Sequence, residues 1–134
     1  MIITLCGSAR WEKIWHEVNK QLGLQGHICF SLMTFPSIEG DKSWYTPEQK
    51  EMLDLAHLLK IEMSDAVVML NVNGYLGESS TRELKWARMR KKEIFWLDYI
   101  DPRVKDIEEN HLYDLLPSKS IDPIEELLNS ISKE

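Results

Sequence analysis

Apolar residues along the chain follow two arrangements: short uninterrupted runs, and stripes with the spacing of a helix. Uninterrupted runs rich in β-branched residues are typical of strands buried on both faces, and stripes at intervals of three and four residues are typical of helices that cover a sheet. The predicted strands are residues 2–6, 27–33, 66–72 and 93–97. The predicted helices are residues 11–22, 46–63, 80–91 and 122–132, with a less distinct one near 104–116.

Strands and helices therefore alternate along the whole sequence. This alternation indicates an open parallel sheet with helices on both faces, because crossover helices must cover such a sheet. The 134 residues suit one domain, and no repeat or linker divides them. We expect a single flavodoxin-like α/β domain over residues 1–134, a three-layer sandwich with strand order 2-1-3-4 and room for a fifth strand.

The helix predicted at 46–63 has two apolar edges. Thr46, Pro47 and Gln49 form a capping box with proline at the first helical position. The main stripe is expected to face the core, and the second edge indicates a subunit interface, so the protein is expected to be a homodimer or a higher homo-oligomer. The main stripe is Met52, Leu55, Ala56, Leu59 and Met63, and the second edge is Leu53, Leu58 and Ile61.

Composition narrows the class of partner. Sixteen basic against 22 acidic residues leave a net charge of −6, which argues against a nucleic-acid polymer or an anionic membrane as the main partner. A small anionic metabolite remains compatible, because a single site can be locally positive. We expect a cytoplasmic protein with reduced thiols at Cys6 and Cys29, a disulfide between them being the less favoured alternative. No cofactor is expected, and His16, His27 and His111 show no metal-binding spacing, so no metal is expected.

Two loops should meet where the winding of such a sheet reverses, between the carboxyl ends of strands 1 and 3. They are "GSAR" (7–10) and "GYLGESS" (74–80), and both lead into helix N-termini that are receptive to a phosphate or carboxylate. Arg10 adds a positive charge. The structural alternative is that the glycines form tight turns and that Ser8 and Ser80 cap helices.

"LCGSAR" after the first strand and "GESSTREL" after the third resemble the nucleoside 2-deoxyribosyltransferase-like superfamily, over residues 1–97. This superfamily includes 2'-deoxynucleoside 5'-monophosphate N-glycosidases and many uncharacterised phage and bacterial proteins. The resemblance implies a flavodoxin-like fold and a nucleoside or nucleotide substrate. It also implies cleavage or exchange of the N-glycosidic bond.

The resemblance also implies roles for individual residues. Glu83 matches the nucleophile that attacks the anomeric carbon. Phosphate-binding positions map onto the two loops, at Gly7, Ser8, Arg10, Gly77, Ser79 and Ser80. Two positions depart from the family: Thr4 stands where the N-glycosidases carry a tyrosine, and His57 stands near their sugar-orienting acidic residue, with Asp54 one turn earlier.

The residues themselves leave the role of Glu83 open. Ser80 and Glu83 have the spacing of a capping box, in which Glu83 would stabilise its own helix and be kept ionised by the helix N-terminus. Cleavage also needs a hydrogen-bond or proton donor for the leaving base, which His57 could supply near neutral pH. Trp44 and Tyr45, in a polar loop, are candidates for stacking on a base.

Two functions of different classes are compatible with these features. The first is an N-glycosidase or deoxyribosyltransferase with Glu83 as nucleophile. The second is a non-catalytic nucleotide-binding module, a sensor or sponge, which the departures at Thr4 and His57 favour. A remoter alternative is a TIR-like domain that cleaves NAD with a glutamate on a similar sheet.

Overall fold

Four parallel strands form the sheet, in the order β2-β1-β3-β4. The computed structural model describes residues 1–32, 45–100 and 122–132. The strands are β1 (Ile2–Gly7), β2 (Ile28–Phe30), β3 (Ala66–Val72) and β4 (Glu93–Tyr99). The predicted order 2-1-3-4 is confirmed, and the described residues contain no fifth strand. The predicted helix near 104–116 lies outside the described residues.

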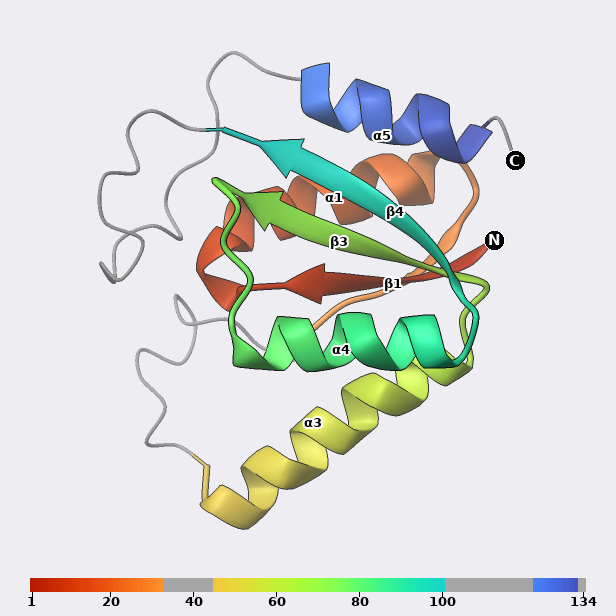
Figure 1. The fold of residues 1–134 in the computed structure, drawn as a ribbon. Helices are drawn as coiled ribbons and strands as arrows, with labels where there is room; N and C mark the ends of the chain where they lie inside the picture. Colours follow the sequence, from red (N-terminus) through yellow and green to blue (C-terminus); the bar gives the residue numbers. More distant parts are fainter. Residues whose placement is uncertain (33–44, 101–121, 133–134) are drawn as a thin grey trace.

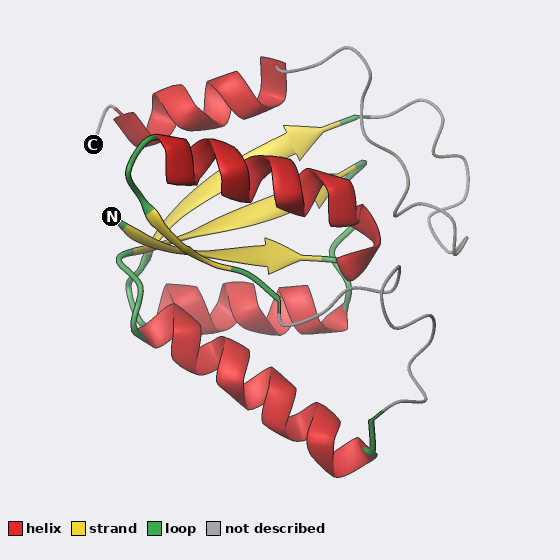
Figure 2. Ribbon diagram, turned by 180° about the vertical axis from the view of Figure 1, so that it is seen from behind, coloured by secondary structure: helices red, strands yellow, loops and turns green. Residues whose placement is uncertain are grey.

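Helices cover both faces of this sheet, as Figures 1 and 2 show from opposite sides. A short 3-10 turn, η1 (Ala9–Trp11), precedes α1 (Glu12–Leu24), which packs with α5 (Asp122–Ser132) on one face. The other face carries α3 (Pro47–Glu62) and α4 (Glu78–Met89). The predicted three-layer α/β sandwich is therefore confirmed. None of the described helices is long and apolar enough to cross a membrane.

Side chains of β1 alternate between the two layers, because successive residues of a strand point to opposite faces. Ile3 and Leu5 belong to the core cluster that includes α1 and α5. Cys6 belongs to the second cluster, with Val67, Met69 and residues of α3 and α4. The thiol of Cys6 therefore lies on the face where α3 and α4 pack.

The orientation predicted for α3 is wrong. The stripe expected in the core is solvent-exposed, with Met52 at 70% and Met63 at 60% exposure, whereas Ile61 and His57 are buried. Ile61, assigned to a subunit interface, packs in the core with Leu58 beside it. Leu59 and Met63 lie on the side of the helix opposite His57 and Ile61, since two residues turn a helix by about 200°. The N-terminal half of α3 also projects away from the sheet (Figure 1).

The predicted start of α4 is also wrong. The helix begins at Glu78 with Gly77 as its N-cap, so Ser80 lies inside the first turn and the Ser80–Glu83 capping box does not form. Thr81 confirms this register, because its backbone N–H donates to Gly77 O at 2.9 Å. The capping box at Thr46 and Gln49 does form, as predicted.

Candidate active site

The two predicted loops meet at the carboxyl ends of neighbouring strands. Gly7, the last residue of β1, pairs with Leu70 of β3. The Arg10 guanidinium lies 5.0 Å from the centre of the Tyr75 ring, so the loop after β1 contacts the loop after β3. The two loops therefore lie next to each other at the carboxyl ends of β1 and β3.

Gly7 has a packing role at this position. A Cβ atom there would lie 2.9 Å from Leu70 Cβ and 3.1 Å from Leu70 O. Any larger residue would push β1 away from β3, because Leu70 is held in the central strand. Ser8 accepts a hydrogen bond from Arg10 N at 3.3 Å and caps η1.

The N-terminus of α4 follows the loop after β3. Gly77 supplies no side-chain cap, and helix geometry leaves the first-turn amides of residues 78–80 without an acceptor inside the helix. These amides and the positive end of the helix dipole suit an anion. Ser79 is half-exposed, whereas the Ser80 side chain is buried, so of the two hydroxyls that of Ser79 is the more accessible.

Three side chains from different elements converge on one another: Cys6 of β1, His57 of α3 and Glu83 of α4. His57 Nε2 lies 3.8 Å from Cys6 Sγ and 3.6 Å from Glu83 Oε2. Cys6 Sγ and a carboxylate oxygen of Glu83 also lie within 4.8 Å of each other. All three residues are buried, and Glu83 Oε2 has no hydrogen-bond partner among the described residues. Glu83 is thus part of a buried cluster and not a helix cap.

The environment of Glu83 favours its neutral form. Burial, followed by the negative charge of Asp54, raises the pKa of Glu83 from 4.5 to about 8, while Arg82, Lys50 and the Cys6 thiol act in the opposite direction. The expectation that the helix N-terminus keeps this carboxylate ionised is therefore wrong. Glu83 is therefore mainly protonated at neutral pH.

His57 is neutral at the same pH. Burial, then the positive charge of Lys60, lowers the pKa of His57 from 6.5 to about 4. Its Nε2 lies 2.9 Å from the carbonyl oxygen of Leu5, which can only accept, so Nε2 carries the proton and donates. His57 does not carry the imidazolium proton that a general acid would release near neutral pH, and its Nε2–H is engaged by the backbone.

Asp54 connects α3 to α4 next to the cluster. Lys50 Nζ donates to Asp54 Oδ1 and Oδ2 at 2.7 and 2.9 Å. Arg82 also donates to Asp54 Oδ2, at 3.4 Å. Asp54 raises the pKa of Glu83, so its charge acts on that carboxyl. One helical turn before His57, Asp54 is the acidic residue of α3 that belongs to the site.

Thr4 lies in the core. Its hydroxyl hydrogen-bonds with Ser64, whose own hydroxyl donates to Lys60 O at 2.7 Å. A threonine this short does not project out of the core as a tyrosine would.

Of the two aromatic candidates of the polar loop, the structure describes Tyr45, which directly precedes Thr46, the N-cap of α3. Trp44 lies outside the described residues.

Sequence reasoning missed the participation of Cys6 and Tyr75. Cys6 contributes a thiol to the cluster, and burial together with the nearby Glu83 raises its pKa. Tyr75 stacks under Arg10 and meets Trp11 edge-to-face. Periodicity identifies Cys6 only as an apolar strand residue, since nothing in the local spacing indicates partners 51 and 77 positions away.

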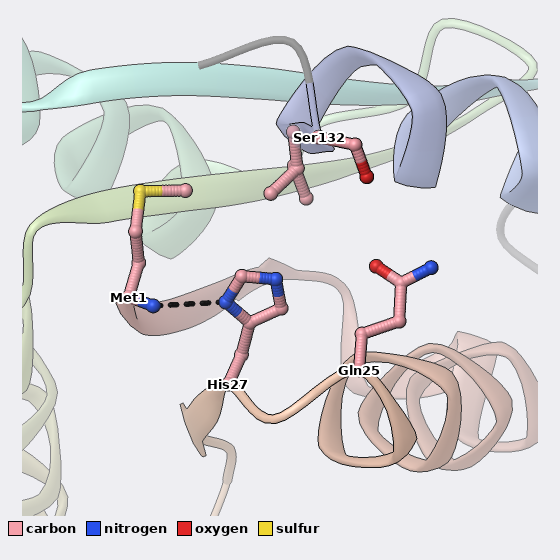
Figure 3. A pocket seen from close by; sticks show the side chains of 5 residues that line it. Met1, Gln25, His27 and Ser132 are labelled. Atoms are coloured by element: carbon pink, nitrogen blue, oxygen red, sulfur yellow. Dashed lines mark hydrogen bonds between the residues drawn. The ribbon is translucent and has the colours of Figure 1, made fainter.

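A separate pocket of about 560 Å³ lies at the opposite edge of the sheet (Figure 3). Met1, Gln25, His27, Ile131 and Ser132 line it. Met1 and His27 stand before β1 and β2, whereas the cluster lies near the carboxyl ends of the strands. The Met1 amino group lies 2.9 Å from His27 Nδ1. This pocket is therefore distinct from the candidate active site.

The strand order and the three layers together define a flavodoxin-like α/β domain. The chain is similar to the 2-deoxyribosyltransferase of Bacillus psychrosaccharolyticus, with a TM-score of 0.60 and 16% identity over 73% of this chain and 72% of that one. It is also similar to the 2-desoxiribosyltransferase of Leishmania mexicana, with a TM-score of 0.54 and 12% identity over 72% and 63% of the two chains. A Clostridium botulinum CMP N-glycosidase matches with a TM-score of 0.49 and 18% identity, over 73% and 69% of the chains.

No model of a known protein family matches the sequence. No curated protein matches it either. At these low sequence identities the solved structures establish a shared fold and not a shared reaction.

Proposed function

We propose that this protein is an enzyme that cleaves or exchanges the N-glycosidic bond of a nucleoside or nucleotide, with Glu83 as its nucleophile. One observation carries the proposal: Glu83 is buried at the carboxyl edge of a sheet that shares the fold of 2-deoxyribosyltransferases, and one of its oxygens has no hydrogen-bond partner among the described residues. The loop at Gly7–Arg10 and the N-terminus of α4 provide places for an anionic substrate group.

In the proposed reaction, a Glu83 oxygen bonds to C1' as the bond from C1' to the base nitrogen breaks. The electron pair of that bond leaves with the base, which takes a proton from solvent or from a donor. Water, or the nitrogen of a second base, then attacks C1', the bond from C1' to the Glu83 oxygen breaks to release a carboxylate, and the attacking group gives up its proton to solvent. The positive charge that develops on the sugar favours the ionised form of Glu83, which offsets the effect of burial in the transition state.

In this proposal neutral His57 does not transfer a proton but holds α3 and the Glu83 carboxyl in place. Its Nε2–H bond to Leu5 O ties α3 to β1, and its ring lies against the reactive carboxyl. Asp54 helps to set the charge around Glu83, because it adds a negative charge that Lys50 and Arg82 partly offset.

The test is to incubate the purified protein with a panel of nucleosides and their monophosphates, ribo and deoxy, with and without an acceptor base. Free base and new nucleosides are followed by chromatography. Glu83→Gln preserves the shape of the side chain and removes the nucleophile, so we expect base release to fall at least about 1000-fold.

Glu51→Gln is the matched control. Glu51 is an exposed carboxylate of α3 outside the candidate site, so its replacement should leave the rate unchanged. Release that persists in Glu83→Gln, or no release from any member of the panel, would contradict the proposal. NAD belongs in the panel too, because nicotinamide release would identify the TIR-like alternative.

A non-catalytic nucleotide-binding module is the second candidate function. The observation in its favour is that Thr4 points into the core and neutral His57 bonds to the backbone, while the loops after β1 and β3 persist. This candidate predicts that a nucleotide raises the melting temperature without turnover, and that Arg10→Ala removes the effect. Lys13→Ala, an exposed change on α1, is the control; no shift with any nucleotide would exclude this function.

We further propose that the protein is a homo-oligomer and that its subunits associate through α3. The stripe Met52, Leu55, Leu59 and Met63 is half-exposed or more along one side of this helix. Exposed apolar patches of this kind mark association surfaces. The proposed interface is therefore the stripe that the sequence pattern assigned to the core.

A further inference from the structure

The cluster of Cys6, His57 and Glu83 combines a thiol, an imidazole and a carboxyl group. Their ligand atoms all lie within 4.8 Å of one another. In a tetrahedral zinc site, metal–ligand distances of about 2.0 to 2.3 Å separate neighbouring ligand atoms by roughly 3.3 to 3.6 Å. The observed separations of 3.8 Å from Cys6 Sγ to His57 Nε2 and 3.6 Å from His57 Nε2 to Glu83 Oε2 are close to that spacing.

The surroundings of the cluster independently indicate a ligand. Glu83 Oε2 is buried and faces the other two groups without a hydrogen-bond partner among the described residues, an arrangement that costs free energy unless something occupies it. The three side chains come from β1, α3 and α4, and the packing of these three elements against one another holds the side chains in place. Glu83 keeps 11% of its side-chain surface exposed, which provides a route from solvent.

We propose that Cys6, His57 and Glu83 form a binding site for Zn²⁺ with one open coordination position. The donor set is borderline-soft, which suits Zn²⁺ better than Mg²⁺ or Ca²⁺. Three protein ligands leave the fourth position to water.

Metal binding rearranges protons within the cluster. The thiol of Cys6 and the carboxyl of Glu83 release their protons to solvent as they become ligands. The proton of His57 moves from Nε2 to Nδ1, which breaks the bond from Nε2 to Leu5 O. This lost hydrogen bond is the main structural cost of the site.

A bound metal would also control the proposed reaction. If Glu83 is the nucleophile, its coordination removes that nucleophile, so Zn²⁺ inhibits and a chelator restores activity. This consequence rests on the proposed function, whereas metal binding itself does not.

The test uses the chelator-treated full chain and Co²⁺ as a spectroscopic substitute for Zn²⁺. Co²⁺ should produce a thiolate-to-cobalt charge-transfer band and the visible bands of a tetrahedral site, with one equivalent bound. Zn²⁺ should abolish these bands by displacement, and competition with a chromophoric chelator gives its affinity. Absence of the thiolate band in the wild-type protein would overturn the proposal without any variant.

Variants then identify the ligands. Cys6→Ser, His57→Gln and Glu83→Gln should each weaken Zn²⁺ binding by on the order of 100-fold or more, and Cys6→Ser should also remove the charge-transfer band. Cys29→Ser, at the other free cysteine, is the matched control and should bind normally. Circular dichroism checks that each variant is folded. Unchanged binding in Cys6→Ser and His57→Gln, or equal loss in Cys29→Ser, would overturn the site.

The readouts separate this inference from the proposed function. A protein that releases base in a Glu83-dependent way but shows no cobalt band supports the function and refutes the metal site. A protein with the cobalt band but no base release from any substrate supports the metal site alone. A response to Ni²⁺ or Cu²⁺ with none to Zn²⁺ would refute the choice of zinc.

Discussion

Glu83 has conflicting requirements if it is the nucleophile that we propose: burial favours its neutral form, but a nucleophile must be ionised. Its pKa of about 8 means that the reactive form becomes dominant only in mildly alkaline solution. The positive charge that develops on the sugar then favours the carboxylate at the transition state.

The first prediction concerns this ionisation. In metal-free buffer, with a nucleoside that carries no titrating phosphate, kcat/KM should rise about tenfold per pH unit below pH 8 and level off above it. His57, with a pKa of about 4, should add no second inflection between pH 6 and pH 9. A profile that is already level at pH 6 would mean that Glu83 is not the titrating nucleophile.

A second prediction concerns two glycines in opposite situations. Gly7→Ala places a Cβ against Leu70 in the central strand pair, so we expect it to lower the free energy of unfolding by about 1–3 kcal/mol. Gly23→Ala on α1 meets no atom within 4 Å and should raise it by about 0.5–1 kcal/mol, because alanine favours the helix.

Denaturant unfolding of both glycine variants measures these changes. Two changes of the same sign would contradict the packing assigned to Gly7.

At the scale of elements, the sequence predicts where strands and helices occur better than how they face. The run at residues 66–72 matches β3 at both ends, because a buried strand has no competing pattern. The face of α3 was reversed because its exposed stripe is as apolar as its buried one, and a buried histidine, His57, carries no hydrophobic signal. The helix α4 begins two residues earlier than predicted, because its N-cap, Gly77, has no side chain that marks it as a cap in the sequence. The serine at position 80, a typical N-cap residue, was therefore predicted to cap the helix.

The candidate site was predictable only in part. Strand order alone brings the loops after β1 and β3 together, and the resemblance singles out Glu83. The contacts of Glu83 with Cys6 and His57 depend on how α3 and α4 sit on the sheet. Local spacing does not contain that information, since the three residues are 51 and 26 positions apart in the chain.

The exposed stripe of α3 leads to a third prediction. The Leu55→Glu and Leu59→Glu double variant should reduce the molar mass in solution to that of a monomer, because it places two charges in the proposed interface. Light scattering coupled to size-exclusion chromatography measures the mass. Met89→Glu changes an even more exposed apolar residue, on α4, and should have no effect. A monomeric wild-type protein would refute the interface.

At the scale of the whole molecule, the buried cluster makes stability depend on pH. The folded pKa of Glu83 lies above its unfolded value, so the folded state binds its proton more tightly and loses stability as pH rises from 4.5 toward 8. His57 acts in the opposite direction, because its lowered pKa makes stability fall as pH drops from 6.5 toward 4. Below pH 6.5 the effects of Glu83 and His57 on the free energy of unfolding oppose each other. Above pH 6.5, of these two residues, only Glu83 still changes the free energy of unfolding.

The fourth prediction follows from that separation. Between pH 6.5 and pH 8, in the presence of a chelator, the free energy of unfolding of the wild-type protein should fall by about 2 kcal/mol relative to Glu83→Gln, since one extra proton bound in the folded state changes stability by about 1.4 kcal/mol per pH unit. Cys6 contributes little below pH 8, because its thiol is protonated there both in the folded state, where its pKa is raised, and in the unfolded state, where its pKa is near 9.0.

Urea unfolding at several pH values measures this difference, and Glu78→Gln, at an exposed residue of the same helix turn, should follow the wild type. Parallel curves for wild type and Glu83→Gln would show that Glu83 is ionised in the folded protein. The nucleophile would then be ready at neutral pH, and the cluster would favour a charged carboxylate over a protonated one.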